Sequence, residues 1–232
     1  MGATVEPAHA PGADRRRFHR EPAEQRREAL IRATLGLISE SGLQAATVRA
    51  IARRAKVTPG LIRHHFHSKE ELILAAYDHH MTRMTEASFA TAEDDGSACA
   101  RARLARFVAA SLGPPVASAA AVTLWAGFIA RLRHDPGMRA IHARTYRDFR
   151  DRLEGLIAAA AAEAGRPAGA AATRRIAIAC NGVIDGLWLE GGALPDGFAP
   201  GELAAIGCEA VGAILGLQLE PDFGIDRERI PQ

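Results

Sequence analysis

The sequence is poor in aromatic residues and in cysteine, and it contains no long unbroken apolar segment. The three cysteines, Cys99, Cys180 and Cys208, are an odd number in no metal-ligand spacing, so we expect reduced, buried thiols and no disulfide. Residues 107–130 are uncharged, but Gly113-Pro114-Pro115 divides them into two pieces that are each too short to cross a bilayer. The N-terminal residues lack the apolar core of a secretion signal. These absences together predict a cytoplasmic protein without a membrane segment.

Signals of β-strands are also missing, because apolar and polar residues do not alternate and β-branched residues are sparse. Apolar residues recur instead every three or four positions, between breaks rich in Gly and Pro. The chain is therefore predicted to be all-α, with about nine helices. Four are expected between residues 24 and 89, and five more near 97–112, 117–133, 136–164, 170–192 and 200–217.

The distribution of charge divides the chain into parts that should have different partners. Residues 1–69 carry 13 Lys and Arg against 6 Asp and Glu, whereas residues 70–232 carry 16 against 21. We expect four parts: a disordered basic arm at 1–22, a small helical head at 23–70, a larger body at 71–220, and a C-terminal tail at 221–232.

Residues 41–69 of the head contain no Asp or Glu. They carry six basic side chains and three histidines, a pattern that favours a phosphate backbone as the partner. A solvated basic helix face is the alternative interpretation. The basic residues are Arg49, Arg53, Arg54, Lys56, Arg63 and Lys69, and the histidines are His64, His65 and His67.

Helix signals divide this stretch into a helix-turn-helix, the motif whose second helix enters the major groove of DNA. Thr47 is a favourable N-cap for a first short helix, and a turn follows at Lys56-Val57-Thr58. Thr58 is expected to cap the second short helix, in which Pro59 takes the first position. Ser68-Lys69-Glu70-Glu71 forms a capping box at the start of the helix that leads into the body.

Residues 47–72 resemble the DNA-binding signature of the TetR (tetracycline-repressor-like) family of bacterial transcriptional regulators, within a match that covers about residues 24–75. The resemblance implies a ligand-responsive regulator, typically a repressor, that binds a palindromic double-stranded DNA operator as a homodimer. It also implies release of the operator when a small-molecule effector enters the body. The DNA-binding residues that it implies are Thr47, Arg49, Thr58, Pro59, Gly60, Arg63, His64, His65 and Lys69.

Two positions depart from the family pattern. The turn has Lys56 where the family usually has Gly, so the backbone must accept a left-handed conformation or turn differently. Arg63 stands where Tyr is frequent, which keeps a phosphate contact available but increases its dependence on salt.

The body gives a weaker signal for a ligand pocket, because aromatic side chains at helical spacing are more often ordinary core. The candidate pocket residues are Trp125, Phe128, Arg131, His134, Met138, Tyr146, Asp185 and Trp188. Residues 124–128 and 181–190 further resemble segments of the choline-sensing repressors of the glycine-betaine pathway. That resemblance makes a quaternary ammonium one candidate ligand class, although the chain is poor in the Tyr and Phe that would complete an aromatic cage.

Two apolar stripes in the last two long helices predict a four-helix dimer interface. Alternatively, these stripes close the core of the monomer itself. They comprise Ile176, Cys180, Val183, Ile184 and Leu187 in the first helix, and Leu203, Ile206, Ala210, Ile214 and Leu217 in the second.

Other functions are less favoured by the sequence. Five histidines lie between residues 64 and 80, but they lack the i, i+4 spacing with a carboxylate partner that a helical metal site needs, so no metal and no cofactor are expected. An enzyme in the body would need a base beside Ser118 or Thr123, or a substrate for Asp185 and Glu190, and the sequence provides no sign of either. A non-specific or architectural DNA-binding protein is the closer alternative.

Overall fold

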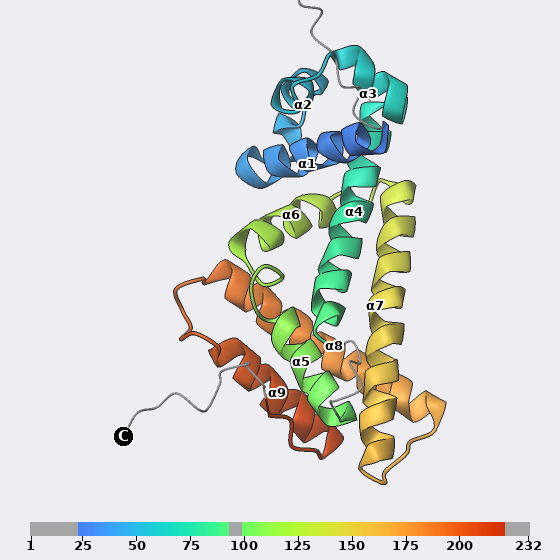
Figure 1. The fold of residues 1–232 in the computed structure, drawn as a ribbon, viewed down its shortest axis with the longest axis vertical. Helices are drawn as coiled ribbons and strands as arrows, with labels where there is room; N and C mark the ends of the chain where they lie inside the picture. Colours follow the sequence, from blue (N-terminus) through green and yellow to red (C-terminus); the bar gives the residue numbers. More distant parts are fainter. Residues whose placement is uncertain (1–22, 93–98, 221–232) are drawn as a thin grey trace, which may run out of the picture.

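The structure is a computed structural model that describes residues 23–92 and 99–220, and within these ranges the chain is all-α (Figure 1). The nine α-helices of the described ranges confirm the predicted fold class. The expected arm at 1–22 and tail at 221–232 lie outside the described residues. The helices are α1 (Ala23–Ser41), α2 (Val48–Arg54), α3 (Pro59–Phe66), α4 (Lys69–Ala90), α5 (Ala100–Ser111), α6 (Ala119–Ile129), α7 (Pro136–Glu163), α8 (Ala170–Ala193) and α9 (Glu202–Leu215), with a short 3₁₀ helix, η1 (Leu43–Ala45), after α1.

Local geometry explains the bounds of the head helices. Gly42 follows α1 with a φ of 76°, which glycine adopts at little cost. Thr47 caps α2 as predicted, since its Oγ1 accepts a hydrogen bond from the N–H of Ala50 at 3.2 Å. Thr58 precedes Pro59 at the start of α3, but its side chain makes no capping hydrogen bond, so the cap expected of its hydroxyl is wrong. Lys56 has a φ of 56°, and the turn therefore takes the left-handed conformation with a lysine in place of glycine.

The start of α4 has one of the two hydrogen bonds of the predicted capping box. The Oγ of Ser68 accepts a hydrogen bond from the N–H of Glu71 at 3.0 Å. The N–H of Ser68 donates to the Phe66 carbonyl instead of to the Glu71 side chain. That carboxylate lies 3.3 Å from Nδ1 of His67. The side chain of Glu71 is thus directed to the end of α3, where His67 has a φ of 53°.

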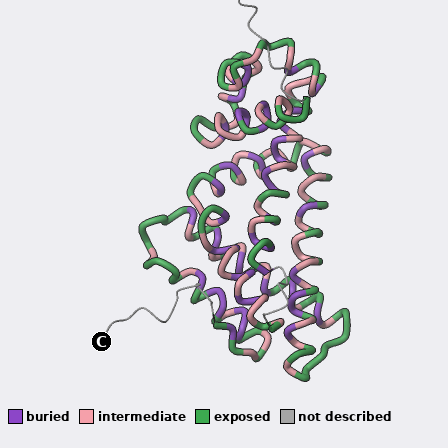
Figure 2. Tube along the Cα trace, viewed as in Figure 1, coloured by how far each residue is buried: buried purple, intermediate pink, exposed green. Residues whose placement is uncertain are grey.

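Two hydrophobic cores share α4, which runs from the head into the body (Figures 1 and 2). The head core packs α1, α2 and α3 against the first half of α4, and it takes in Phe128 of α6 and Met138 of α7. The body core packs α5, α7, α8 and α9 around the second half of α4, which contributes Phe89. Trp125 of α6 packs against both cores. A displacement of α4 or α6 would therefore be felt in both parts of the molecule.

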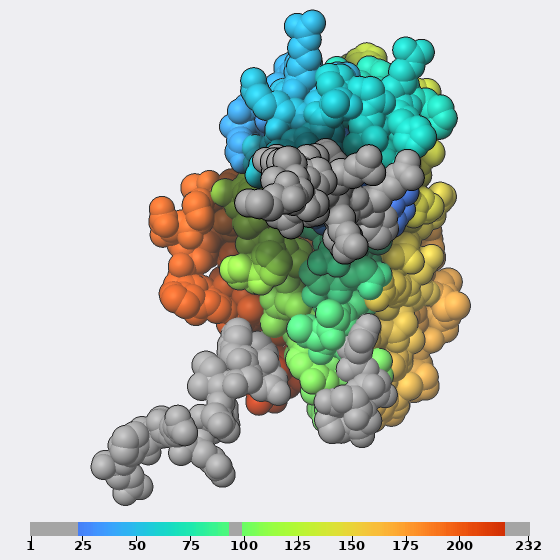
Figure 3. Space-filling view, turned by 45° about the horizontal axis from the view of Figure 1, so that its top comes forward, coloured from blue at the N-terminus to red at the C-terminus, as the bar shows by residue number. Residues whose placement is uncertain are grey.

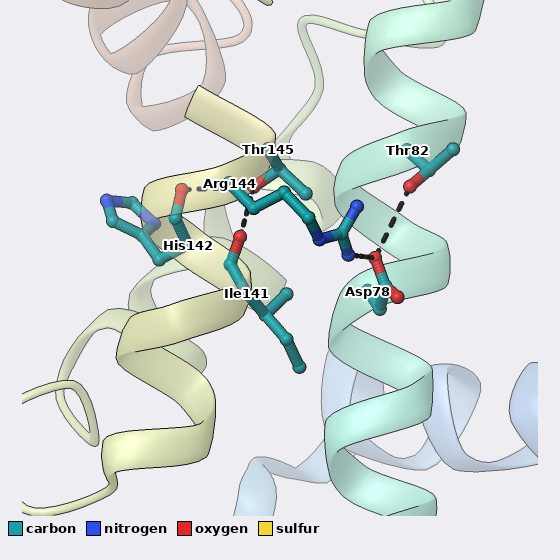
Figure 4. Close-up of polar contacts among 6 residues, drawn as sticks. All are labelled: Asp78, Thr82, Ile141, His142, Arg144 and Thr145. Atoms are coloured by element: carbon teal, nitrogen blue, oxygen red, sulfur yellow. Dashed lines mark hydrogen bonds and ion pairs between the residues drawn. The ribbon is translucent and has the colours of Figure 1, made fainter. Parts of the chain in front are cut away.

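Polar side chains also join α4 to α7 (Figure 4). Arg144 of α7 forms an ion pair with Asp78 of α4, as the close-up shows. Farther along the same two helices, Arg152 pairs with Glu86 at 3.0 Å. Because the side chains of these ion pairs are largely exposed, they add little to the stability of the fold. They help to set which faces of α4 and α7 meet.

The break at residues 113–115 separates α5 from α6, as the sequence predicted. None of the described helices is long and apolar enough to span a bilayer. Helix α6 ends at Ile129, before the expected residue 133, because the chain tightens there: the N–H groups of Arg131 and Leu132 donate to carbonyls only three residues earlier. At the start of α7, Asp135 accepts a hydrogen bond from the N–H of Met138 at 3.0 Å, and Arg139 donates to the carbonyl of Leu132 at 3.1 Å. The turn is thus held by α7.

The cysteines differ from the expectation at one position. Cys180 and Cys208 are buried as predicted, and burial raises the pKa of each thiol to about 11. Cys99 is exposed, because it is the residue that precedes the first turn of α5. All three are free thiols.

Candidate DNA-binding face and internal cavity

The head carries α2 and α3 at one end of the molecule, away from α8 and α9 (Figures 1 and 3). Every residue that the sequence marked for DNA binding belongs to α2, to α3 or to the residues at the start of α2, α3 and α4. Most of these side chains are free to meet a partner. Thr47, Arg49, Thr58, Pro59, Gly60, Arg63 and His64 are exposed, and His65 and Lys69 are partly buried.

The basic side chains of this face are mostly unpaired. Three carboxylates flank residues 41–69 in sequence. Glu40 and Glu71 are engaged by Arg54 and His67, and Glu70 is exposed next to Lys69 at the start of α4. Because no other carboxylate competes for them within residues 41–69, the remaining cations are available to phosphates. Within residues 41–69, all of which the structure describes, the cations without an ion pair are Arg49, Arg53, Lys56, Arg63 and Lys69.

Arg54 has a structural role that the sequence did not indicate. Its guanidinium makes two hydrogen bonds to Glu40 of α1, at 2.5 and 2.6 Å, and these hold the pKa of the Glu40 carboxyl below its usual value. A Cβ at Gly36 would lie 2.6 Å from the Arg54 guanidinium, so glycine leaves the room in which this side chain crosses α1. Arg54 therefore ties α2 to α1.

The first turn of α3 is open to a ligand. A Cβ added at Gly60 would meet no atom within 4 Å. The Thr58 hydroxyl makes no capping bond, so it can donate or accept elsewhere together with the free N–H groups of the helix start. His65 is placed differently from the rest of this surface. Burial and the neighbouring charges of His64, Arg26 and Arg27 lower its pKa, and the two arginines lie near the start of α1.

The body contains a cavity of about 70 Å³ between α4, α5, α6, α7 and α8. A single water molecule needs about 10–15 Å³ of space measured in this way, so the cavity has room for several waters or for a small organic ligand. Four of the predicted pocket residues line it, namely Trp125, Tyr146, Asp185 and Trp188. The remaining lining is Met81, Met84, Thr85, Ser88, Ser111, Val116, Thr145, Phe149, Asn181 and Ile184.

Asp185 is the charged residue of the cavity lining. Burial raises the pKa of its carboxyl to about 6, against the opposing effect of two hydrogen bonds. These come from Nδ2 of Asn181 at 2.9 Å and from the hydroxyl of Tyr146 at 3.4 Å, and both reach the same oxygen, Oδ2. The rings of Trp125 and Trp188 meet nearby edge to face, with centroids 5.9 Å apart.

The structure does not bring the other predicted pocket residues to this cavity. Phe128 is about 60° around α6 from Trp125, because a helix advances 100° per residue, and it packs on Tyr77 with ring centroids 4.7 Å apart. Met138 lies in the head core. Arg131 and His134 lie in the turn between α6 and α7, outside the cavity lining.

Several cavity residues were missed from the sequence. Asn181 had a usable signal, since it lies four residues before Asp185 and therefore shares a face of α8 with it. The hydroxyl residues had none, because they come from helices far apart in sequence. One of them, Thr145, donates to the carbonyl of Ile141 at 3.0 Å (Figure 4).

The residues weighed for metal binding and catalysis have local roles. No group of three or more His, Cys, Asp or Glu side chains in the described ranges is placed to hold a metal ion. The Oγ of Ser118 accepts from the N–H of Ala121 at 3.2 Å and so caps α6. Thr123 donates to the Ala119 carbonyl at 2.8 Å within the same helix. Both hydroxyls thus satisfy the backbone of α6.

Helices α8 and α9 expose large apolar side chains, but these only partly match the predicted stripes. Cys180 and Ile184 are buried, because this side of α8 belongs to the body core, against which Ile176 and Leu187 also pack. The exposed row of α8 is shifted by two residues and includes two glycines, Gly182 and Gly186. The exposed large apolar residues of the two helices are Ile178, Leu189, Ile206 and Ile214, each about two-fifths exposed.

Comparisons with known families match both parts of the chain. Residues 30–76 match the bacterial regulatory proteins of the tetR family, and residues 100–216 match the C-terminal domain of BetI-type transcriptional repressors. The HTH-type transcriptional regulator BetI of Burkholderia thailandensis is 35% identical over 169 residues, which cover 72% of this chain and 82% of that protein. BetI of Paraburkholderia phymatum is 34% identical over 176 residues, with 75% and 85% covered.

Solved structures have the same fold. A transcriptional regulator from Pseudomonas aeruginosa PAO1 superimposes with a TM-score of 0.75 at 30% identity, covering 86% of this chain and 95% of that one. A regulator from Saccharomonospora viridis, determined in complex with choline, superimposes with a TM-score of 0.64 at 18% identity, covering 83% and 96%. The second likeness shows the fold alone.

Proposed function

Because this chain belongs to the TetR family of bacterial transcriptional regulators, with a BetI-type C-terminal domain, we propose that it binds a palindromic operator as a homodimer and releases it when a small organic cation enters the cavity. It is a transcriptional repressor with a DNA-binding helix-turn-helix. The matched families consist of transcriptional regulators and not of enzymes. The proposed site of action is the cytoplasm, where bacterial operators lie.

The observation that carries the proposal is the outer end of the head, where α2 and α3 present unpaired cations and an open first turn without a competing carboxylate. The Thr47 hydroxyl, whose oxygen accepts from Ala50, still has its proton for a phosphate, and Lys69 supplies a charge at the start of α4. Arg49 and the surface of α3 from Thr58 to His64 are the proposed base-reading part. His65 is proposed only at the edge of this surface, since it is partly buried.

Dimerisation is proposed through the exposed apolar faces of α8 and α9. Ile178 and Leu189 flank the two glycines of α8, so a second copy of these helices could approach closely there. Two reading heads are needed, because a palindromic operator presents half-sites about 34–36 Å apart, one helical turn along the DNA.

The effector is proposed to act through α4 and α6. Trp125 lines the cavity and also packs against both cores, while α4 contributes Met81 to the cavity and carries the head. A ligand that favours one position of these helices would change the separation of the two heads and thereby release the operator. A quaternary ammonium such as choline is one candidate, supported by the buried carboxylate of Asp185 and by the two tryptophans beside it.

Selection of bound duplexes from a random library by the full-length protein tests this function. The expected result is an inverted repeat whose half-sites are one helical turn apart, bound by two chains. Enrichment of no sequence would support the non-specific alternative and refute the proposal.

A further inference from the structure

The strongest hydrogen-bond donors of the cavity wall are already bonded to acceptors of the protein itself. The indole N–H of Trp188 donates to the Val116 carbonyl at 2.7 Å. The amide of Asn181 and the hydroxyl of Tyr146 both donate to Asp185. A ligand that needs to receive hydrogen bonds would therefore find little to bind here.

The hydroxyls of the wall follow the same pattern. Ser88, Ser111 and Thr145 each donate to a backbone carbonyl one turn earlier in their own helices, at 3.1, 2.8 and 3.0 Å. Their oxygens keep lone pairs that can accept. Thr85 is the exception among the lining hydroxyls, since it makes no hydrogen bond within the described part of the chain. Thr85 can serve as donor or acceptor.

Two acceptors of the wall are left over. Oδ1 of Asn181 is buried without a hydrogen-bond partner. The two donors that reach Asp185 share Oδ2, so Oδ1 of that carboxylate is also unused. Exchanging the amide atoms of Asn181 would set its carbonyl against the carboxylate, so the orientation with Oδ1 free is the consistent one. A buried unpaired acceptor costs about 1–3 kcal/mol. No Lys or Arg lines the cavity to neutralise Asp185.

A quaternary ammonium satisfies the charge but not the acceptors, because it has no N–H group. Its attraction would have to come from aromatic faces, and the tryptophan pair meets edge to face, with only Tyr146 and Phe149 as further rings. A protonated amine would instead supply donors to Asp185 and Asn181 within a smaller volume.

We propose that the cavity selects a small protonated amine, whose N–H groups donate to Asp185 Oδ1 and Asn181 Oδ1, over the quaternary ammonium of the same skeleton. The inference rests on the proposed function in that it takes this cavity as the effector site. In this proposal Asn181 makes the affinity depend on the number of N–H donors of the ligand, and Asp185 makes it depend on the positive charge.

A methylation series tests the proposal. Ethanolamine, its N-methyl and N,N-dimethyl derivatives and choline share one hydroxyl and one positive charge, and they differ in the number of N–H donors. Calorimetric titration of the full-length protein should give affinity that falls with each methyl group, with choline at least tenfold weaker than ethanolamine. Equal affinities, or choline as the tightest ligand, would overturn the proposal.

The Asn181→Leu variant should flatten the series by weakening ethanolamine more than choline. If Asn181→Leu fails to fold, Asp185→Asn is the second variant, and it should weaken every member of the series because the positive charge loses its partner. A steep series that neither variant changes would refute the assignment of these oxygens.

Operator binding measured on the same samples separates this inference from the proposed function. If choline is the one member of the series that releases the operator, the proposed function as a ligand-responsive repressor is supported and the preference for an amine is refuted. If no member of the series binds while the operator is still bound, the amine inference fails and the repressor function stands.

Discussion

The hydroxyl of Tyr77 lies 2.7 Å from Nδ1 of His142, where α4 meets α7. Tyr77 is fully buried and packs on Phe128 of the head core, while the ring of His142 lies 4.4 Å from that of Tyr146 in the cavity wall. Burial raises the pKa of Tyr77 to about 12 and lowers the pKa of His142, so both groups are neutral at neutral pH and the phenol donates. One set of contacting side chains therefore connects the cavity to the helix that carries the head.

Removing this hydrogen bond should weaken the coupling between cavity and head. Tyr77→Phe should cost about 1 kcal/mol of unfolding free energy, the net worth of one hydrogen bond. It should also reduce the factor by which the tightest amine lowers operator affinity, measured by fluorescence anisotropy with and without ligand. Asp78→Asn, which removes an exposed ion pair between the same two helices, is the control and should leave this factor unchanged. An unaltered factor in Tyr77→Phe would show that coupling takes another route.

Phosphate and base contacts should separate in the salt dependence of DNA binding. Lys69→Ala should weaken operator and random duplexes about equally and reduce the slope of log K against log salt by about one unit. His64→Ala should weaken the operator selectively, because His64 is exposed on the reading helix. Arg147→Ala, an exposed arginine of α7, is the charge-matched control and should change neither quantity. An unchanged slope for Lys69→Ala would remove Lys69 from the phosphate contacts.

Lys56→Gly should stabilise the protein. The lysine has a φ of 56°, a conformation that costs a residue with a Cβ about 1–2 kcal/mol, and part of that gain is offset by the greater freedom of glycine in the unfolded chain. We expect a net gain of about 0.5–1 kcal/mol in urea unfolding. Lys56→Ala, which removes the charge but keeps the strain, should give no such gain. Equal stability in the two variants would contradict the strain account.

Asp185→Asn should be more stable than the natural protein at neutral pH and lose amine binding. The folded pKa of about 6 lies above the usual 3.8, so the stability that this group contributes is present below pH 3.8 and is lost as the pH rises through 6. The advantage of the variant in unfolding free energy should grow by about 1 kcal/mol between pH 5 and pH 7. Urea unfolding at the two pH values measures it. A difference independent of pH would indicate that the carboxyl titrates normally.

The sequence was sufficient for features set by local chemistry. The caps at Thr47 and Ser68, the proline at the start of α3 and the breaks between helices predicted nearly every helix. The features it could not predict depend on which way a helix is rotated in the fold. Phe128 faces the head core while Trp125 faces the cavity, and Ile184 is buried while Ile178 is exposed. Such choices follow from long-range packing of α6 and α8, for which spacing within one helix contains no signal.

The most direct test of the central claim, that α3 enters DNA, compares two glycines. A Cβ at Gly60 or at Gly155 of α7 meets no atom within 4 Å, so leucine at either position should fold with an unchanged or slightly higher melting temperature. We predict that Gly60→Leu lowers the affinity for the selected operator at least tenfold, about 1.4 kcal/mol, whereas Gly155→Leu binds like the natural protein. Natural affinity in a folded Gly60→Leu protein would contradict the account.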